Sequence, residues 1–149
     1  ALEEGVLTTV GTDHAPHEIE KKRGNYMQCA SGCTGVQYLL PALMDLVKRG
    51  EMTLETLIKV TASNPAERFR IKDRGRISEG FYADLAIINP IAGHTVTTDD
   101  IASSCKWSPF TGHSFKTSVV HTVVSGRLCV RNGCLCDDVC GCALEFDHI

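Results

Sequence analysis

The most constraining feature of this sequence is an apolar, β-branched run that ends abruptly in polar residues. Val6–Val10 is followed by Gly11, Thr12 and Asp13. Such a run is typical of a buried strand, and its last residues would present a carboxylate at the rim of a sheet. The charged stretch over residues 18–24 then predicts an exposed loop.

A helix is expected after this loop. From Gly35 onward apolar residues recur at helical spacing, and the pattern stops at Gly50, after two basic residues. Strand, loop and helix in this order form one β/α unit, the building block of parallel α/β folds. The apolar positions of the helix are Val36, Leu39, Leu40, Leu43, Leu46 and Val47.

Two shorter helices are predicted next, and then the period changes to that of strands. Thr53 is a suitable N-cap for the first helix, and Asn64 for the second, with Pro65 in its first turn. Apolar runs at 83–89 and 119–124 predict strands, and Ser125-Gly126 predicts a tight turn into residues 128–130. The second half of the chain is therefore expected to be a small β-structure.

Composition excludes several classes of function. The 149 residues are 43% hydrophobic and 22% charged, which is typical of a globular protein of one domain, or one and a part. A net charge of -3 without a basic face argues against nucleic acid as a partner. The sequence lacks an apolar stretch of membrane-spanning length and the zones of a signal peptide, so we expect a cytoplasmic protein. Ala1, in place of an initiator Met, suggests a cut through a larger protein.

Eight cysteines raise the question of disulfides or metal binding. Without an export signal, reduced thiols are the expected state. Cys29 and Cys33 are interpreted as small residues in a loop. The tail has the pattern C-x-C-x₃-C-x-C over residues 134–142, and four thiolates could enclose Zn²⁺ or Cu(I). A small metal-binding module therefore stays open as one alternative.

The segment Thr12–His17, with the sequence T-D-H-A-P-H, carries the most chemical information. A carboxylate and two imidazoles at the end of a buried strand would lie where parallel α/β folds keep their catalytic groups. Asp and His also supply suitable oxygen and nitrogen ligands for Zn²⁺. The alternative is a capped loop with a surface His.

This segment resembles the eighth-strand motif of dihydroorotases, which belong to the amidohydrolases. Residues 31–37, S-G-C-T-G-V-Q, are similar to the glycine-containing substrate loop of that family. Residues 64–66 and 75–85 resemble the stretch where such enzymes pass from the barrel into a small β-domain, and residues 108–112 and 119–126 resemble their closing segment. The resemblance covers nearly the whole chain.

The resemblance implies an α/β fold: the C-terminal β/α portion of a (β/α)₈ TIM barrel over residues 1–70, then a small β-sandwich-like domain with the cysteine-rich tail over 71–149. It implies hydrolysis of the cyclic amide of dihydroorotate, or the reverse cyclisation of N-carbamoyl-aspartate, in pyrimidine biosynthesis. Asp13 would contact one of two Zn²⁺ ions and move the proton from the attacking water to the leaving nitrogen. His17, Ser31 and Gly32 would bind the substrate, and His14 would be a structural, hydrogen-bonded imidazole.

Other parts of the family's site are expected upstream of Ala1: the H-x-H pair, the bridging lysine and two further histidines. By itself this chain is therefore expected to be inactive. Dihydropyrimidinases and allantoinases share the opening of the motif but generally lack a His at the position of His17, which favours an acidic substrate. Two other functions stay open: another cyclic amidohydrolase, or a non-catalytic dihydroorotase-like assembly protein. The sequence does not determine the oligomeric state, and a homo-oligomer is possible.

Overall fold

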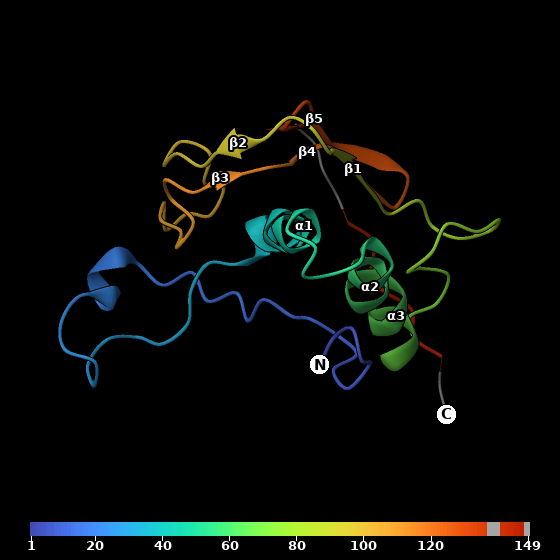
Figure 1. The fold of residues 1–149 in the computed structure, drawn as a ribbon, viewed down its shortest axis with the longest axis horizontal. Coiled ribbons are helices and arrows are strands. Elements are labelled where there is room, and N and C mark those ends of the chain that lie inside the picture. The colour runs from blue at the N-terminus through green and yellow to red at the C-terminus, as the bar shows by residue number, and fades with distance from the viewer. Residues whose placement is uncertain (137–140, 148–149) are drawn as a thin grey trace.

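The computed structural model describes residues 1–136 and 141–147. Its strands form one layer, the longest helix lies against that layer, and the N-terminal segment runs as an extended arm before it turns back into the helix (Figure 1). That helix, α1 (Leu39–Lys48), follows the single 3₁₀ turn η2 (Val36–Tyr38) and ends as predicted before Gly50. None of the described helices is long and apolar enough to cross a membrane.

The next helices form one continuous run. Thr53 caps α2 (Leu54–Ile58) as predicted, since its hydroxyl accepts a hydrogen bond from the Thr56 N–H at 3.1 Å. A π-helical turn, η3 (Lys59–Ser63), leads directly into α3 (Asn64–Arg68). The prediction that Asn64 caps a separate helix was wrong, because the chain is already helical there. Its side-chain amide instead donates to the carbonyl of Thr8 at 2.8 Å and ties the N-terminal arm to the helices.

The strands pair antiparallel. The larger sheet has the order β1-β4-β5-β6, formed by β1 (Leu85–Asn89), β4 (Ser118–Val124), β5 (Arg127–Arg131) and β6 (Cys134–Leu135). The predicted turn between β4 and β5 is confirmed: Ser125 and Gly126 both have positive φ angles, 50° and 81°. Paired positive φ angles match the twist of a two-residue hairpin.

The expected β-sandwich-like packing is not what the described strands form. The two-stranded sheet of β2 (His94–Thr95) and β3 (Ser114–Phe115) lies further along the same two chain segments that pair as β1 and β4. Strands therefore make a long antiparallel ribbon in one layer (Figure 1). Ile88 of β1 and Phe115 of β3 pack against residues of η2 and α1 rather than against a second sheet.

Both hydrophobic cores combine residues from before and after position 70. In the first, Leu43 and Met44 of α1 meet Met52 and Leu57, and Ile88 of β1 packs against them. The second core joins Tyr38 to Val96 and Phe115, with Phe110 at its edge. Tyr38 and Phe115 stack with ring centroids 5.8 Å apart. The ribbon and the helices thus stabilise each other by shared burial.

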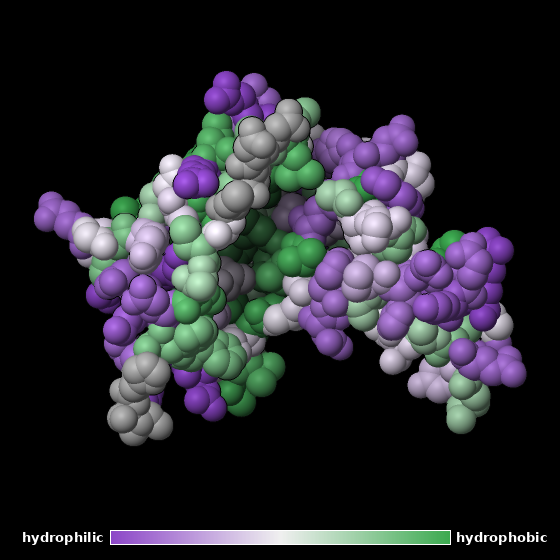
Figure 2. Space-filling model, turned by 180° about the vertical axis from the view of Figure 1, so that it is seen from behind, coloured by the Kyte–Doolittle hydropathy of each residue, from purple (hydrophilic) through white to green (hydrophobic). Residues whose placement is uncertain are grey.

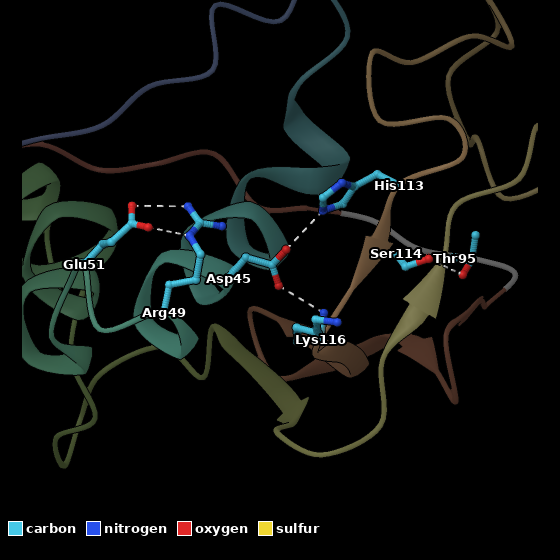
Figure 3. Close-up of polar contacts among 7 residues, drawn as sticks. All are labelled: Asp45, Arg49, Glu51, Thr95, His113, Ser114 and Lys116. Atoms are coloured by element: carbon cyan, nitrogen blue, oxygen red, sulfur yellow. Dashed lines mark hydrogen bonds and ion pairs between the residues drawn. The ribbon is translucent and has the colours of Figure 1, made fainter.

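A buried carboxylate adds a polar link between α1 and the ribbon (Figure 3). Asp45 is 7% exposed, and it accepts hydrogen bonds from His113 Nε2 and from the Lys116 N–H, both at 3.0 Å. Burial by itself raises the pKa of Asp45, but these two hydrogen bonds and the charges of His113 and Arg49 lower that pKa overall. Hydrogen bonds to a buried carboxylate favour its ionised form.

The prediction of a strand at Val6–Val10 was wrong for this chain. The segment forms no strand, and the side chains of Val6 and Leu7 are 73% and 56% exposed. A strand needs a neighbour for its backbone hydrogen bonds. Among the described residues this run receives only isolated contacts, such as the bond from the Val10 N–H to the Val60 carbonyl at 3.1 Å.

Apolar side chains gather around a hollow in the middle of one face of the molecule (Figure 2).

Candidate active site

The Asp13 side chain lies exposed at the end of the extended N-terminal arm. Its backbone has a positive φ of 44°, a conformation that L-residues other than Asn and Asp rarely adopt. The chain therefore changes direction at Asp13. Asp13 is thus accessible to a ligand that approaches this end of the arm.

His14 joins the Asp13 turn to the glycine-containing loop. Its Nδ1 accepts hydrogen bonds from the N–H groups of Gly35 and Val36, at 3.2 and 3.4 Å. His14 also forms a parallel bridge with Cys33, and the Ala15 N–H donates to the Cys33 carbonyl at 2.8 Å. The prediction of a hydrogen-bonded, structural imidazole is confirmed. Nδ1 therefore acts as an acceptor for the backbone of the loop.

Two glycines permit this close approach of the two segments. A Cβ atom on Gly32 would lie 2.7 Å from the Cβ of Ala15, and the φ angle of Gly32 is 87°. A Cβ on Gly35 would lie 3.3 Å from Thr12. Larger residues would push the loop off the Asp13 turn. The sequence places Asp13 and Gly32 far apart, and the fold brings their segments side by side.

His17 and Ser31 occupy the same two segments. His17 is half-buried, and its N–H donates to the Ala15 carbonyl at 2.9 Å, whereas Ser31 is exposed. The structure therefore gathers the segments that carry Asp13, His17, Ser31 and Gly32, although no hydrogen bond joins the side chains of Asp13, His17 and Ser31 to one another. Their roles stay predictions.

Trp107 was missed as a residue of this region. Its indole Nε1 donates to the carbonyl of His17 at 2.6 Å. Its own carbonyl accepts a hydrogen bond from the Thr34 hydroxyl at 2.9 Å. Trp107 thus connects both segments of the site to the second half of the chain. No spacing in the sequence signals such a contact, because 90 residues separate the indole from its acceptor.

The Lys22 side chain binds the backbone of the glycine-containing loop. Its ammonium group donates to the carbonyls of Ala30 and of Gly32, the latter at 2.7 Å. The same ammonium lies 5.8 Å from the centre of the Trp107 ring, within the range of a cation–π contact. Lys22 was read only as part of a charged loop, yet it fixes the backbone next to Ser31.

A small cavity and a larger groove on the described part of the chain differ in their relation to these segments. A small cavity of about 100 Å³ is lined by His14, Thr34, Tyr38 and Ser103, among others. It is the one near the Asp13 turn, and it has room for a few water molecules. A larger groove of about 800 Å³ is lined by residues of α3 and the turn after it, including Arg70 and Phe81, and by none of the predicted site residues.

The other candidate ligands do not gather. Within residues 1–136 and 141–147, no group of three His, Cys, Asp or Glu side chains could hold a metal ion. His94 pairs with Asp100 at 2.9 Å and His113 with Asp45, so each imidazole has a carboxylate partner within the fold. The thiols of Cys134, Cys136 and Cys142 are unpaired, while Cys140 and His148 lie outside the described residues. The four-thiolate tail site therefore stays untested.

Comparisons with known proteins extend these observations. Residues 1–129 match the model of the Amidohydrolase family. The chain is 39% identical over 112 residues to a dihydroorotase of Halobacterium salinarum and 38% identical over 128 residues to one of Geobacter metallireducens. These matches cover 75% and 86% of this chain, but only 26% and 30% of the two relatives. The chain thus spans less than a third of their length.

Solved structures of related enzymes have the same fold. The L-hydantoinase (dihydropyrimidinase) from Arthrobacter aurescens superposes with a TM-score of 0.85 and 29% identity, over 91% of this chain and 31% of the other. A D-hydantoinase (dihydropyrimidinase) from Thermus sp. superposes with a TM-score of 0.84, at 24% identity. The arm, the helices and the ribbon therefore reproduce the arrangement found within much longer proteins.

Proposed function

Because this chain belongs to the amidohydrolase family, we propose that it forms part of a dihydroorotase. Such an enzyme hydrolyses the cyclic amide of dihydroorotate, or closes N-carbamoyl-aspartate in the reverse direction. The observation that carries the proposal is the pairing of the Asp13 turn with the Ser31-Gly32 loop through His14 and Cys33. The identity of 31–39% to dihydroorotases over most of the chain supports it.

We further propose the division of the chain suggested by its sequence. Residues 1–70 would complete a (β/α)₈ barrel, and residues 71–149 would form the small β-domain beside it. In such a barrel Val6–Val10 would lie between two neighbouring strands. That placement would cover Val6 and Leu7, whose exposure is otherwise costly for apolar side chains.

Each site residue has a proposed role. Asp13 accepts the proton of the attacking water and delivers it to the amide nitrogen that leaves. The half-buried His17 binds the carboxylate of the substrate, and Ser31 and Gly32 present backbone groups to the same ligand. Gly32 suits this role because it has no side chain to obstruct a close approach.

Two zinc ions are part of the proposal for the longer protein. The exposed Asp13 carboxylate could serve as one ligand of a zinc ion, but the described residues do not complete a metal site. When bound, the metal would lower the pKa of the attacking water and polarise the amide carbonyl. The remaining ligands would come from the rest of the protein.

The first test follows from the proposal that most metal ligands lie outside this chain. We expect the 149-residue chain to show no turnover of dihydroorotate in the presence of Zn²⁺, because Asp13 alone cannot hold the metal ions. Absorbance of the substrate amide reports the reaction directly. Turnover by the purified chain, removed by the Asp13→Asn substitution, would contradict the proposed division.

His17→Ala in the longer protein tests the proposed recognition of the substrate carboxylate. Loss of a charged hydrogen bond costs roughly 1.5–3 kcal/mol, which corresponds to a rise in KM of about tenfold to a hundredfold. The value of kcat should change much less if the contact is equal in ground and transition states. An unchanged KM for dihydroorotate would remove His17 from the substrate site.

Trp107→Phe tests whether the indole positions His17. Phenylalanine keeps a ring for Lys22 but lacks the N–H that reaches the His17 carbonyl. We expect KM to rise by about twofold to tenfold, as for the loss of one neutral hydrogen bond. Steady-state kinetics of the longer protein give this value, and the His17→Ala, Trp107→Phe double variant supplies the control. Full additivity of the two effects would contradict a positioning role.

A second candidate function is supported by the superposition on the L-hydantoinase from Arthrobacter aurescens. In that case the substrate would be an uncharged cyclic amide, and His17 would have no carboxylate to bind. The His17→Ala variant would then leave KM unaltered for the preferred substrate. The relative turnover of charged and uncharged rings separates the two candidates.

A further inference from the structure

Two cysteines face each other across the C-terminal hairpin. In the ladder between β5 and β6, Val130 pairs with Leu135 and Arg131 pairs with Cys134. The Cys136 N–H also donates to the carbonyl of Cys129 at 2.9 Å, so the ladder continues by one more pair. Cys129 and Cys136 are therefore direct cross-strand neighbours.

The geometry of such a pair suits a disulfide. Directly opposite residues of an antiparallel ladder project their side chains from the same face. A hydrogen-bonded pair has a Cα–Cα separation of about 5.5 Å, and disulfides are most frequent at about 5.5–6 Å. Little backbone movement is needed for a bond between these two sulfur atoms.

The two thiols differ in access. Cys129 is 5% exposed, whereas Cys136 is half-buried and reachable from solvent. The Cys129 thiol donates to the carbonyl of Arg127 at 3.3 Å. Rotation of the Cys129 side chain away from that carbonyl would direct its sulfur across the hairpin.

We propose that Cys129 and Cys136 are a site of reversible oxidation by low-molecular-weight disulfides. The Cys136 thiolate attacks the reagent, forms a mixed disulfide and releases one thiol. The Cys129 thiolate then attacks the Cys136 sulfur and releases the second thiol. The reagent is reduced to two thiols, the protein loses two hydrogen atoms, and β6 becomes covalently fastened to β5.

Cys134 provides the matched control. It lies in β6, two residues before Cys136, but its cross-strand partner is Arg131, which cannot form a disulfide. It is also more exposed than Cys136. If exposure alone decided the reaction, Cys134 would be the preferred partner of Cys129, whereas the register of the ladder favours Cys136.

The experiment treats the folded 149-residue chain with glutathione disulfide, blocks the remaining thiols and digests with trypsin. Cleavage after Arg127 and Arg131 separates residues 128–131 from residues 132–149, so a bond from Cys129 to the tail links two peptides. We expect this linked species in the wild type and in Cys134→Ser, its loss in Cys136→Ser, and its reversal by dithiothreitol. A link that persists in Cys136→Ser, or a wild type that carries only glutathione adducts, would overturn the proposal.

Discussion

Asp13→Asn in the longer protein is expected to lower kcat by at least about 10²–10⁴-fold, the usual contribution of a general acid–base group. Asparagine has almost the shape of aspartate, but it cannot take the proton of the attacking water. Any loss of a metal contact would add to this effect. The assay is steady-state hydrolysis of dihydroorotate by protein of matched metal content.

The fold should not change, because the Asp13 side chain is exposed. Asp99→Asn serves as the control, since Asp99 is an exposed aspartate of the second half of the chain, outside the site segments. The two variants should melt at the same temperature as the wild type, and only Asp13→Asn should lose turnover. Retained turnover in Asp13→Asn would refute the proton-transfer role.

The second large effect is expected on stability, from Asp45→Ala. The substitution removes the acceptor of two hydrogen bonds, those from His113 Nε2 and from the Lys116 N–H (Figure 3). A hydrogen bond to a charged group contributes about 1.5–3 kcal/mol, so we expect the free energy of unfolding to fall by several kcal/mol. Urea unfolding of the chain, followed by far-UV circular dichroism, gives this quantity.

Glu51→Gln is the matched control for this prediction. Glu51 pairs with Arg49 near the end of α1, but both side chains are more than half exposed, so their ion pair contributes little. Its loss should leave the free energy of unfolding nearly unchanged. Equal effects of the two substitutions would show that the Asp45 contacts do not hold α1 to the ribbon.

The hydrogen bonds of Asp45 are expected to stabilise the fold less at acid pH. The pKa of Asp45 is lowered in the folded chain, mainly because the Lys116 N–H and His113 outweigh the opposing effect of burial. Its stabilisation is therefore complete above the unfolded pKa of about 4, and it is lost as the pH falls through the folded value. Asp45→Asn should flatten this acid limb of the stability profile.

The parts of the fold that were predicted from the sequence depend on local signals. The helical spacing before Gly50, the hydroxyl of Thr53 and the Ser125-Gly126 turn each act within a few residues, and all three are present in the structure. Asn64 was misread because its amide bonds to a distant carbonyl rather than to its own helix. A local pattern cannot reveal that choice.

The failed predictions concern partners distant in the sequence. Val6–Val10 has the pattern of a strand, but a strand also needs neighbours, which the described residues do not supply. The ribbon was taken for a sandwich because strand patterns do not tell whether a helix or a second sheet covers them. The contact of Trp107 with His17 spans 90 residues and depends on the whole fold.

The candidate site was predicted mainly through resemblance. The D-H-x-x-H pattern alone left a surface loop equally open, and nothing in the spacing placed it beside residues 31–35. His14 is the exception, since alternation along the chain already suggested that it and Asp13 face opposite ways. Its Nδ1 does accept hydrogen bonds from the Gly35 and Val36 N–H groups, although residues 6–13 form no strand.

The preference of the longer protein for a negatively charged ring tests the proposed role of His17 most directly. The longer protein should be assayed for kcat/KM with dihydroorotate and with dihydrouracil, the same ring without the carboxylate. Dihydroorotate should be favoured by at least about tenfold, the effect of one charged hydrogen bond. Equal values, or a preference for the uncharged ring, would contradict the assignment.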